Sequence, residues 1–255
     1  MNSAVTLGLK IYLCLLDTWS LYGKPSPDLV NSNKTDQYLA LQNSWKKIIK
    51  NLLKDPVSFN TFVSNALVPL ISLVGTHPSL FAIDLMNEPE GITTNDNSIT
   101  ISDVINYISV CADAIHAYQP TVKVSCGFSQ RQTVLSNATR LADHLDFFDI
   151  HVYNDSGDLD LYQLSDFAQK QCIIGECGYP VGKTQYDSTR ELPVLQTFLN
   201  NANLQGYAGC LAWLEDYTNK SAILNSVKDF ADTMPIIQIS TKKEGLFYCN
   251  SNIGF

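Results

Sequence analysis

The sequence has 255 residues, 45% of them hydrophobic, which is enough for one sizeable hydrophobic core. The formal net charge of −8 disfavours a nucleic-acid or anionic-membrane partner, because both carry negative charge themselves. The seven cysteines include no zinc-type CxxC pair and indicate no disulfide framework at this chain length, so the redox compartment stays open.

Six apolar runs along the chain predict buried β-strands. The first, KIYLCLL at 10–16, is too short for a signal peptide or for a membrane span of roughly 20 residues. The strands are expected at 10–16, 80–86, 122–126, 147–152, 171–175 and 207–213. Amphipathic helices are expected at 36–54, 58–75, 101–118, 159–170, 189–203 and 221–233. This alternation predicts an α/β fold with parallel strands.

Polar side chains end several of these strands. In a (β/α) barrel, functional groups lie at the C-terminal ends of many strands, whereas a doubly wound sheet usually carries a glycine-rich phosphate loop after an early strand. No such glycine loop occurs here, and the strand-end residues are Asp17, Asn87, Glu88, His151, Tyr153, Glu176 and Trp213. The sequence therefore predicts a barrel.

Side chains alternate between the two faces of a strand, so residues two apart are expected to share a face. This alternation places Ile174 on the same face as Glu176, and Asp149 on the same face as His151. Asp149 and Asp84 would then be buried acids, which need polar partners and are expected to be mainly structural.

Two glutamates, Glu88 and Glu176, end the second and the fifth of the six predicted strands, three strand positions apart. A barrel is narrow, so two inward groups at its rim can approach to about 5 Å, the separation at which one carboxylate attacks a sugar carbon while the other protonates the leaving oxygen. The pair therefore predicts glycoside hydrolysis.

Four motifs carry a family resemblance. FAIDLMNEPE, FFDIHVY, CIIGECGYP and GCLAW resemble the glycoside hydrolases of clan A, most closely family 5, the cellulase and mannanase group. The resemblance implies a (β/α)8 barrel of TIM type and a retaining mechanism, with Glu88 as acid/base and Glu176 as nucleophile. It also implies substrate-binding roles for Asn87 at the sugar 2-hydroxyl, Tyr153 with His151 beside Glu176, Trp213 as the floor under the sugar, and Asp17 and Trp19 toward the non-reducing end.

Within that resemblance, 10–16 matches the third strand of the barrel. The expectation is therefore a single catalytic domain over 1–255 that lacks the first two βα units, followed by a hairpin-like extension at 235–255 with its turn at 243–245. A barrel without those units would have unpaired strand edges, one of which the extension could cover.

The predicted function is a retaining endo-β-glycosidase acting on a β-1,4-linked glucan or mannan. Its expected partner is a polysaccharide or oligosaccharide, with no cofactor, metal, nucleic acid or membrane, and a monomer is expected. The cellular location is unknown; the resemblance favours an extracellular protein, although no signal peptide is visible in the sequence.

Two other functions stay open. A non-catalytic, carbohydrate-binding barrel derived from such an enzyme would fit the missing strands. A metal-dependent hydrolase would need histidine and aspartate clusters, and of the four histidines only His151 ends a strand. His151 as a core histidine and Trp19 as a loop aromatic are further readings that the sequence leaves open.

Overall fold

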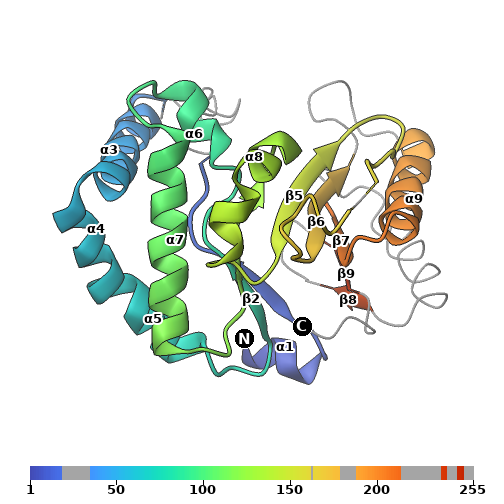
Figure 1. The fold of residues 1–255 in the computed structure, drawn as a ribbon, viewed down its shortest axis with the longest axis horizontal. Helices are drawn as coiled ribbons and strands as arrows, with labels where there is room; N and C mark the ends of the chain where they lie inside the picture. Colours follow the sequence, from blue (N-terminus) through green and yellow to red (C-terminus); the bar gives the residue numbers. More distant parts are fainter. Residues whose placement is uncertain (19–34, 162, 179–187, 214–236, 240–245, 250–255) are drawn as a thin grey trace. The chain divides into compact units, whose positions relative to one another are not determined.

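A computed structural model describes residues 1–18, 35–161, 163–178, 188–213, 237–239 and 246–249. The chain forms two compact units (Figure 1). The N-terminal unit is Tyr12–Phe128, and the C-terminal unit is Ser129–Phe255 together with Met1–Ile11. Parallel strands connected by helices occur in each, so the predicted α/β class is confirmed.

The N-terminal unit contains a three-stranded sheet in the order β1-β2-β3. β2 and β3 are parallel, with Ile83 opposite Val124. Its elements are β1 (Ile11–Cys14), α3 (Thr35–Lys54), α4 (Pro56–Phe62), the π-helical turn η1 (Val63–Leu67), α5 (Val68–Val74), β2 (Leu80–Asp84), α6 (Glu90–Asn95), α7 (Ile101–Tyr118), β3 (Val124–Ser125) and β4 (Gly127–Phe128).

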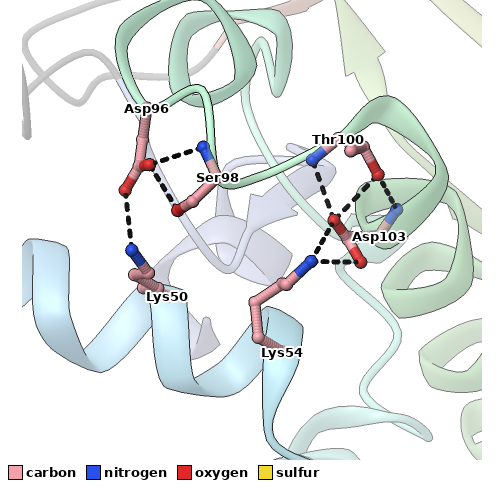
Figure 2. A network of polar contacts seen from close by, with 6 residues as sticks. All are labelled: Lys50, Lys54, Asp96, Ser98, Thr100 and Asp103. Atoms are coloured by element: carbon pink, nitrogen blue, oxygen red, sulfur yellow. Dashed lines mark hydrogen bonds and ion pairs between the residues drawn. The ribbon is translucent and has the colours of Figure 1, made fainter.

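Helix α7 is bonded to the chain just beyond β2. It has the predicted bounds, because Thr100 caps its first turn and Asp103 completes a capping box with it. Further along, the Tyr107 hydroxyl donates to the carbonyl of Leu85, just beyond β2. Figure 2 shows the capping box joined to α3 through Lys54, whose Nζ lies 3.0 Å from Asp103 Oδ2.

The helix predicted at 58–75 is present but divided. Pro69 lies in the first turn of α5 and has no backbone N–H to donate, and the π-helical turn η1 immediately precedes α5. Pro56–Val74 has a mean hydropathy of 1.6, so it could cross a membrane by length and composition alone, a property that core helices share. Here Phe59, Leu67 and Ile71 are buried, but Val57 and Leu73 are exposed and most residues of the segment are not buried.

The C-terminal unit continues the parallel pattern. Strands β5, β6 and β7 are parallel neighbours, β9 pairs antiparallel with β7, and β8 pairs antiparallel with β9. β8 and β9 lie within the segment predicted as a hairpin, whose turn is outside the described residues. The elements are α1 (Asn2–Thr6), α8 (Arg131–Ala142), β5 (Phe148–Tyr153), β6 (Cys172–Gly178), α9 (Ser188–Leu204), β7 (Gly209–Ala212), β8 (Ile237–Ile239) and β9 (Leu246–Cys249).

Strand β6 contains an extra residue at Gly175. Ile150 lies opposite Ile174, but the next residue of β5, His151, lies opposite Glu176. The register with β7 shifts over the same stretch. Such a bulge interrupts the alternation of side chains. The expectation that Ile174 shares a face with Glu176 is therefore wrong: Glu176 follows the face of its partner His151.

Two helix predictions differ from the structure. The segment 159–170 is not helical in its described residues: turns occupy 164–169, and Ala168 and Gln169 have positive φ angles of 49° and 66°. Conversely, α8 was not predicted, although its buried Val134, Ala138 and Leu141 follow a helical spacing. The helix predicted at 221–233 lies outside the described residues.

Candidate active site

Three of the predicted site residues meet at the end of β2 in the N-terminal unit. Asp17 and Asn87 form a parallel β-bridge, in which the Asn87 N–H donates to the carbonyl of Leu16 over 2.8 Å. The Asn87 side-chain amide also donates to Asp17 Oδ1 over 3.2 Å. Asp17 thus fixes the orientation of the Asn87 amide beside Glu88.

The backbone of Glu88 is in a conformation that residues other than glycine seldom adopt. Its φ is 46°, in the left-handed region, and the residue is only 5% exposed. Its N–H donates to the carbonyl of Gly127 over 2.7 Å, and its carbonyl accepts from the Thr18 hydroxyl over 2.7 Å. These bonds hold the strained turn and so set the direction of the carboxylate.

Thr18 is a site residue that the sequence analysis missed. It is 1% exposed, and its hydroxyl donates to the carbonyls of both Asn87 and Glu88. A Cβ at Gly91 would lie 3.0 Å from the Thr18 hydroxyl oxygen, so the helix start after Pro89 also packs against it. A lone threonine after an apolar strand carries no sequence signal for this role.

In the C-terminal unit, two further predicted residues, Tyr153 and His151, lie around a carboxylate oxygen of the third, Glu176. The Tyr153 hydroxyl donates to Glu176 Oε2 over 2.6 Å, and His151 Nδ1 lies 3.5 Å from the same oxygen. On the other side of the ring, His151 Nε2 lies 3.9 Å from Asp149 Oδ1. Asp149 and His151 are buried, whereas the Glu176 side chain is 17% exposed and can meet a ligand.

The bulge at Gly175 is what places Glu176 in this cluster, since it brings Glu176 opposite His151 rather than one position away. It also makes room for a buried acid. A Cβ at position 175 would overlap the Asp149 carboxylate, so a side chain larger than hydrogen does not fit there.

Trp213 and Trp19 complete the predicted set. Trp213 follows β7 and is half-buried. Its backbone N–H donates to the carbonyl of Cys177, the residue after Glu176. Trp19 lies outside the described residues. The predicted residues thus form one group around Glu88 and a second around Glu176, each described within its own unit.

Asp84 has the structural partners expected of a buried acid. Its Oδ1 accepts from the backbone N–H groups of Met86 and Gly127, over 3.1 and 3.0 Å. These bonds tie the end of β2 to β4, directly before the turn that carries Glu88.

Solved structures of mannanases have a fold similar to that of this chain. The β-1,4-mannanase of the sea hare Aplysia kurodai is 19% identical, with a TM-score of 0.57 over 94% of this chain and 70% of that one. The endo-1,4-β-mannanase of Eisenia fetida is 18% identical, with a TM-score of 0.60 over 89% and 68%. At this identity the likeness is one of fold, and it agrees with the resemblance to the mannanase group.

A curated relative matches part of the sequence more closely. A mannan endo-1,4-β-mannosidase of Cryptopygus antarcticus is 40% identical over 52 residues, which are 20% of this chain and 13% of that protein. The match therefore spans much less than two thirds of the relative's length. No protein-family model matches the sequence.

Proposed function

We propose that this chain is a glycoside hydrolase that cleaves β-1,4-linked mannan internally, by a retaining double displacement on a (β/α)8-type barrel. The observation that carries the proposal is the hydrogen-bonded Glu176 carboxylate at a strand end, in a chain with the fold of β-mannanases. The partial sequence match to a mannan endo-1,4-β-mannosidase favours mannan over glucan as the substrate.

Glu176 is the proposed nucleophile. A nucleophilic carboxylate must be ionised and must be held in one orientation while it attacks the anomeric carbon. The Tyr153 hydroxyl donates a hydrogen bond to Oε2. This bond favours the ionised carboxylate and fixes its orientation. His151, against the same oxygen, limits the rotation of the carboxylate further.

Glu88 is the proposed acid/base. It would protonate the leaving glycosidic oxygen as Glu176 attacks, and then remove a proton from the water that displaces Glu176, so that the anomeric configuration is retained. Its burial and its hydrogen-bonded left-handed backbone suit this role, because a proton donor must be fixed relative to the scissile bond. Asn87, held by Asp17, is proposed to bind the sugar 2-hydroxyl.

Activity is tested on soluble β-1,4-mannan, with β-1,4-glucan as the comparison substrate. We expect release of reducing ends and of oligosaccharides from mannan, and proton NMR of the first products should show retained anomeric configuration. Binding without hydrolysis would instead indicate a non-catalytic carbohydrate-binding barrel, and initial products of inverted configuration would exclude the double displacement.

Matched variants separate the two glutamates. Glu176→Ala should lose hydrolysis and regain turnover of an activated aryl β-mannoside in azide, with an α-mannosyl azide as product. Glu88→Ala should lose about 10²–10⁴-fold in kcat and give the β-azide, because the nucleophile is still present. Tyr153→Phe should lower kcat more than it raises KM. An equal loss of kcat in Glu176→Ala, Glu88→Ala and Tyr153→Phe, without azide rescue, would contradict these roles.

A further inference from the structure

Two buried thiols face each other beside the proposed nucleophile, and neither has a place in the proposed mechanism. The Sγ atoms of Cys177 and Cys210 lie 3.3 Å apart, and both residues are fully buried. Cys177 directly follows Glu176 on β6, and Cys210 lies on the neighbouring strand β7. The two thiols are not bonded to each other in this structure.

The register of the strands explains why the two thiols meet. Ile174 lies opposite Cys210 and Cys177 lies opposite Ala212, so three residue steps on β6 match two on β7. The extra residue at Gly175 puts Cys177 on the face occupied by Cys210, the face opposite to Glu176. Without the bulge the two side chains would lie on different faces of the sheet.

We infer that Cys177 and Cys210 form a disulfide when the chain folds in an oxidising environment, and that this bond fastens β7 to the end of β6. A disulfide bond is about 2.05 Å long, so the sulfur atoms must approach by roughly 1.2 Å. An irregular ladder is the part of a sheet that can accommodate such a shift, because its strands are not held by a continuous row of hydrogen bonds.

The chemistry requires a co-reactant, and a low-molecular-weight disulfide such as glutathione disulfide supplies it. One cysteine thiolate attacks this disulfide, forms a mixed disulfide and releases one thiol. The second cysteine then attacks the mixed disulfide, closes the Cys177–Cys210 bond and releases the second thiol. The two cysteines together lose two electrons and two protons, which the small disulfide gains as two thiols.

The folded environment determines when the reaction occurs. Burial raises the pKa of the Cys177 thiol well above its ordinary value, and the neighbouring Cys210 and Glu176 raise it further. Because the thiolate is the reactive form, the Cys177 thiol reacts slowly in the closed sheet, and burial keeps external reagents away from both sulfurs. The bond therefore forms while β7 is docking onto β6, and it forms slowly or not at all in the folded, reduced protein.

The test refolds the reduced, denatured chain in a buffer of glutathione and glutathione disulfide, then blocks free thiols and digests with trypsin without reduction. The expected product joins the tryptic peptides 171–183 and 191–220, which contain Cys177 and Cys210. Because 171–183 also contains Cys172, the variant Cys172→Ala should keep the linked product, and Cys177→Ala and Cys210→Ala should lose it.

Thermal unfolding supplies a second readout. The bond would close a loop between residues 33 positions apart, and it should raise the apparent midpoint by on the order of 10 °C relative to the reduced wild type. Cys172→Ala should show the same shift and Cys177→Ala none. Free thiols at both positions after refolding, a glutathione adduct alone, or a link from Cys210 to Cys172 or Cys249 would overturn the inference.

Discussion

At Glu88 the backbone and the side chain make opposite demands on the sequence. The left-handed φ of 46° favours glycine, whereas the proposed acid/base role requires a carboxylate. We therefore expect Glu88→Gly to be more stable than Glu88→Ala by about 1 kcal/mol, because only alanine retains the steric cost of this conformation. Urea unfolding midpoints of the two variants measure the difference.

Both variants should lose most of their hydrolytic rate on mannan, by about 10²–10⁴-fold in kcat, since neither has a carboxylate at this position. Glu88→Gln provides the matched control, because it keeps the shape of the side chain and the strained backbone while removing the acid. If the alanine and glycine variants had equal urea unfolding midpoints, the left-handed backbone at this position would not be strained.

The Asp149 carboxylate occupies the space that a side chain at position 175 would need. A Cβ there would overlap this carboxylate within a packed sheet, so Gly175→Ala should destabilise the protein by about 1–3 kcal/mol. In the double variant with Asp149→Ala, the overlap disappears and part of this loss should be recovered. A double-mutant cycle built from the four unfolding free energies isolates that coupling. Additive costs would mean that Asp149 is not what the alanine side chain meets.

At the scale of secondary-structure elements, the strands and the long helices could be predicted because their signals are local. The capping residue Thr100 and the apolar spacing of 101–118 give α7 its bounds, and every described strand up to β7 overlaps a predicted apolar run or, for β4, directly follows one. The helix predicted at 159–170 was wrong because the chain makes turns over 164–169, where Ala168 and Gln169 have positive φ angles that a right-handed helix does not accommodate.

The candidate residues could be predicted from the strand ends, but their geometry could not. The one-residue bulge at Gly175 depends on how β6 pairs with both neighbouring strands, and a single sequence does not contain that register. The same holds for Thr18, whose hydroxyl bonds two carbonyls about 70 residues further along the chain. A glycine inside a strand was the only available sign of the bulge.

The start of α7 has a carboxylate whose contribution to stability depends on pH. Burial opposes the ionisation of Asp103, but hydrogen bonds from Thr100 and Lys54 outweigh it and hold the pKa below its ordinary value (Figure 2). A carboxylate with a lowered folded-state pKa stabilises the fold above its unfolded-state pKa, and this contribution is lost as pH falls through the folded-state pKa. Between about pH 5 and pH 2, the wild type should therefore lose more stability than Asp103→Asn.

Unfolding free energies measured across that range test the dependence. Thr100→Ala should cost about 1 kcal/mol at neutral pH through the lost cap. Lys50→Gln is the control, because it breaks only the exposed pair with Asp96 and should leave stability nearly unchanged. Parallel pH curves for the wild type and Asp103→Asn would show that this carboxylate does not contribute in the way that its contacts indicate.

At the scale of the whole molecule, the fold is shared with mannanases at 18–19% identity, while the predicted site residues occupy only a few strand ends. A fold of this kind tolerates replacement of most side chains, because any apolar residues of suitable size can fill its layers. The candidate site does not tolerate such replacement, since each proposed role depends on one functional group. Substitutions should accordingly separate into those that change stability and those that change only turnover.

The last strands of the chain protect a sheet edge, and their removal should expose it. β9 pairs antiparallel with β7 from Gly209 opposite Cys249 to Ala212 opposite Leu246, and β8 extends the sheet from β9. Deleting 235–255 would leave the outer backbone groups of β7 without these partners, and an open edge of this kind promotes association between chains.

We expect the shortened protein to unfold at a lower temperature and to form oligomers or aggregates in size-exclusion chromatography with light scattering. Deleting only 250–255 keeps β9 and is the matched control, which should behave as the full chain does. A monomeric, equally stable protein without 235–255 would show that β9 contributes nothing to closing this edge.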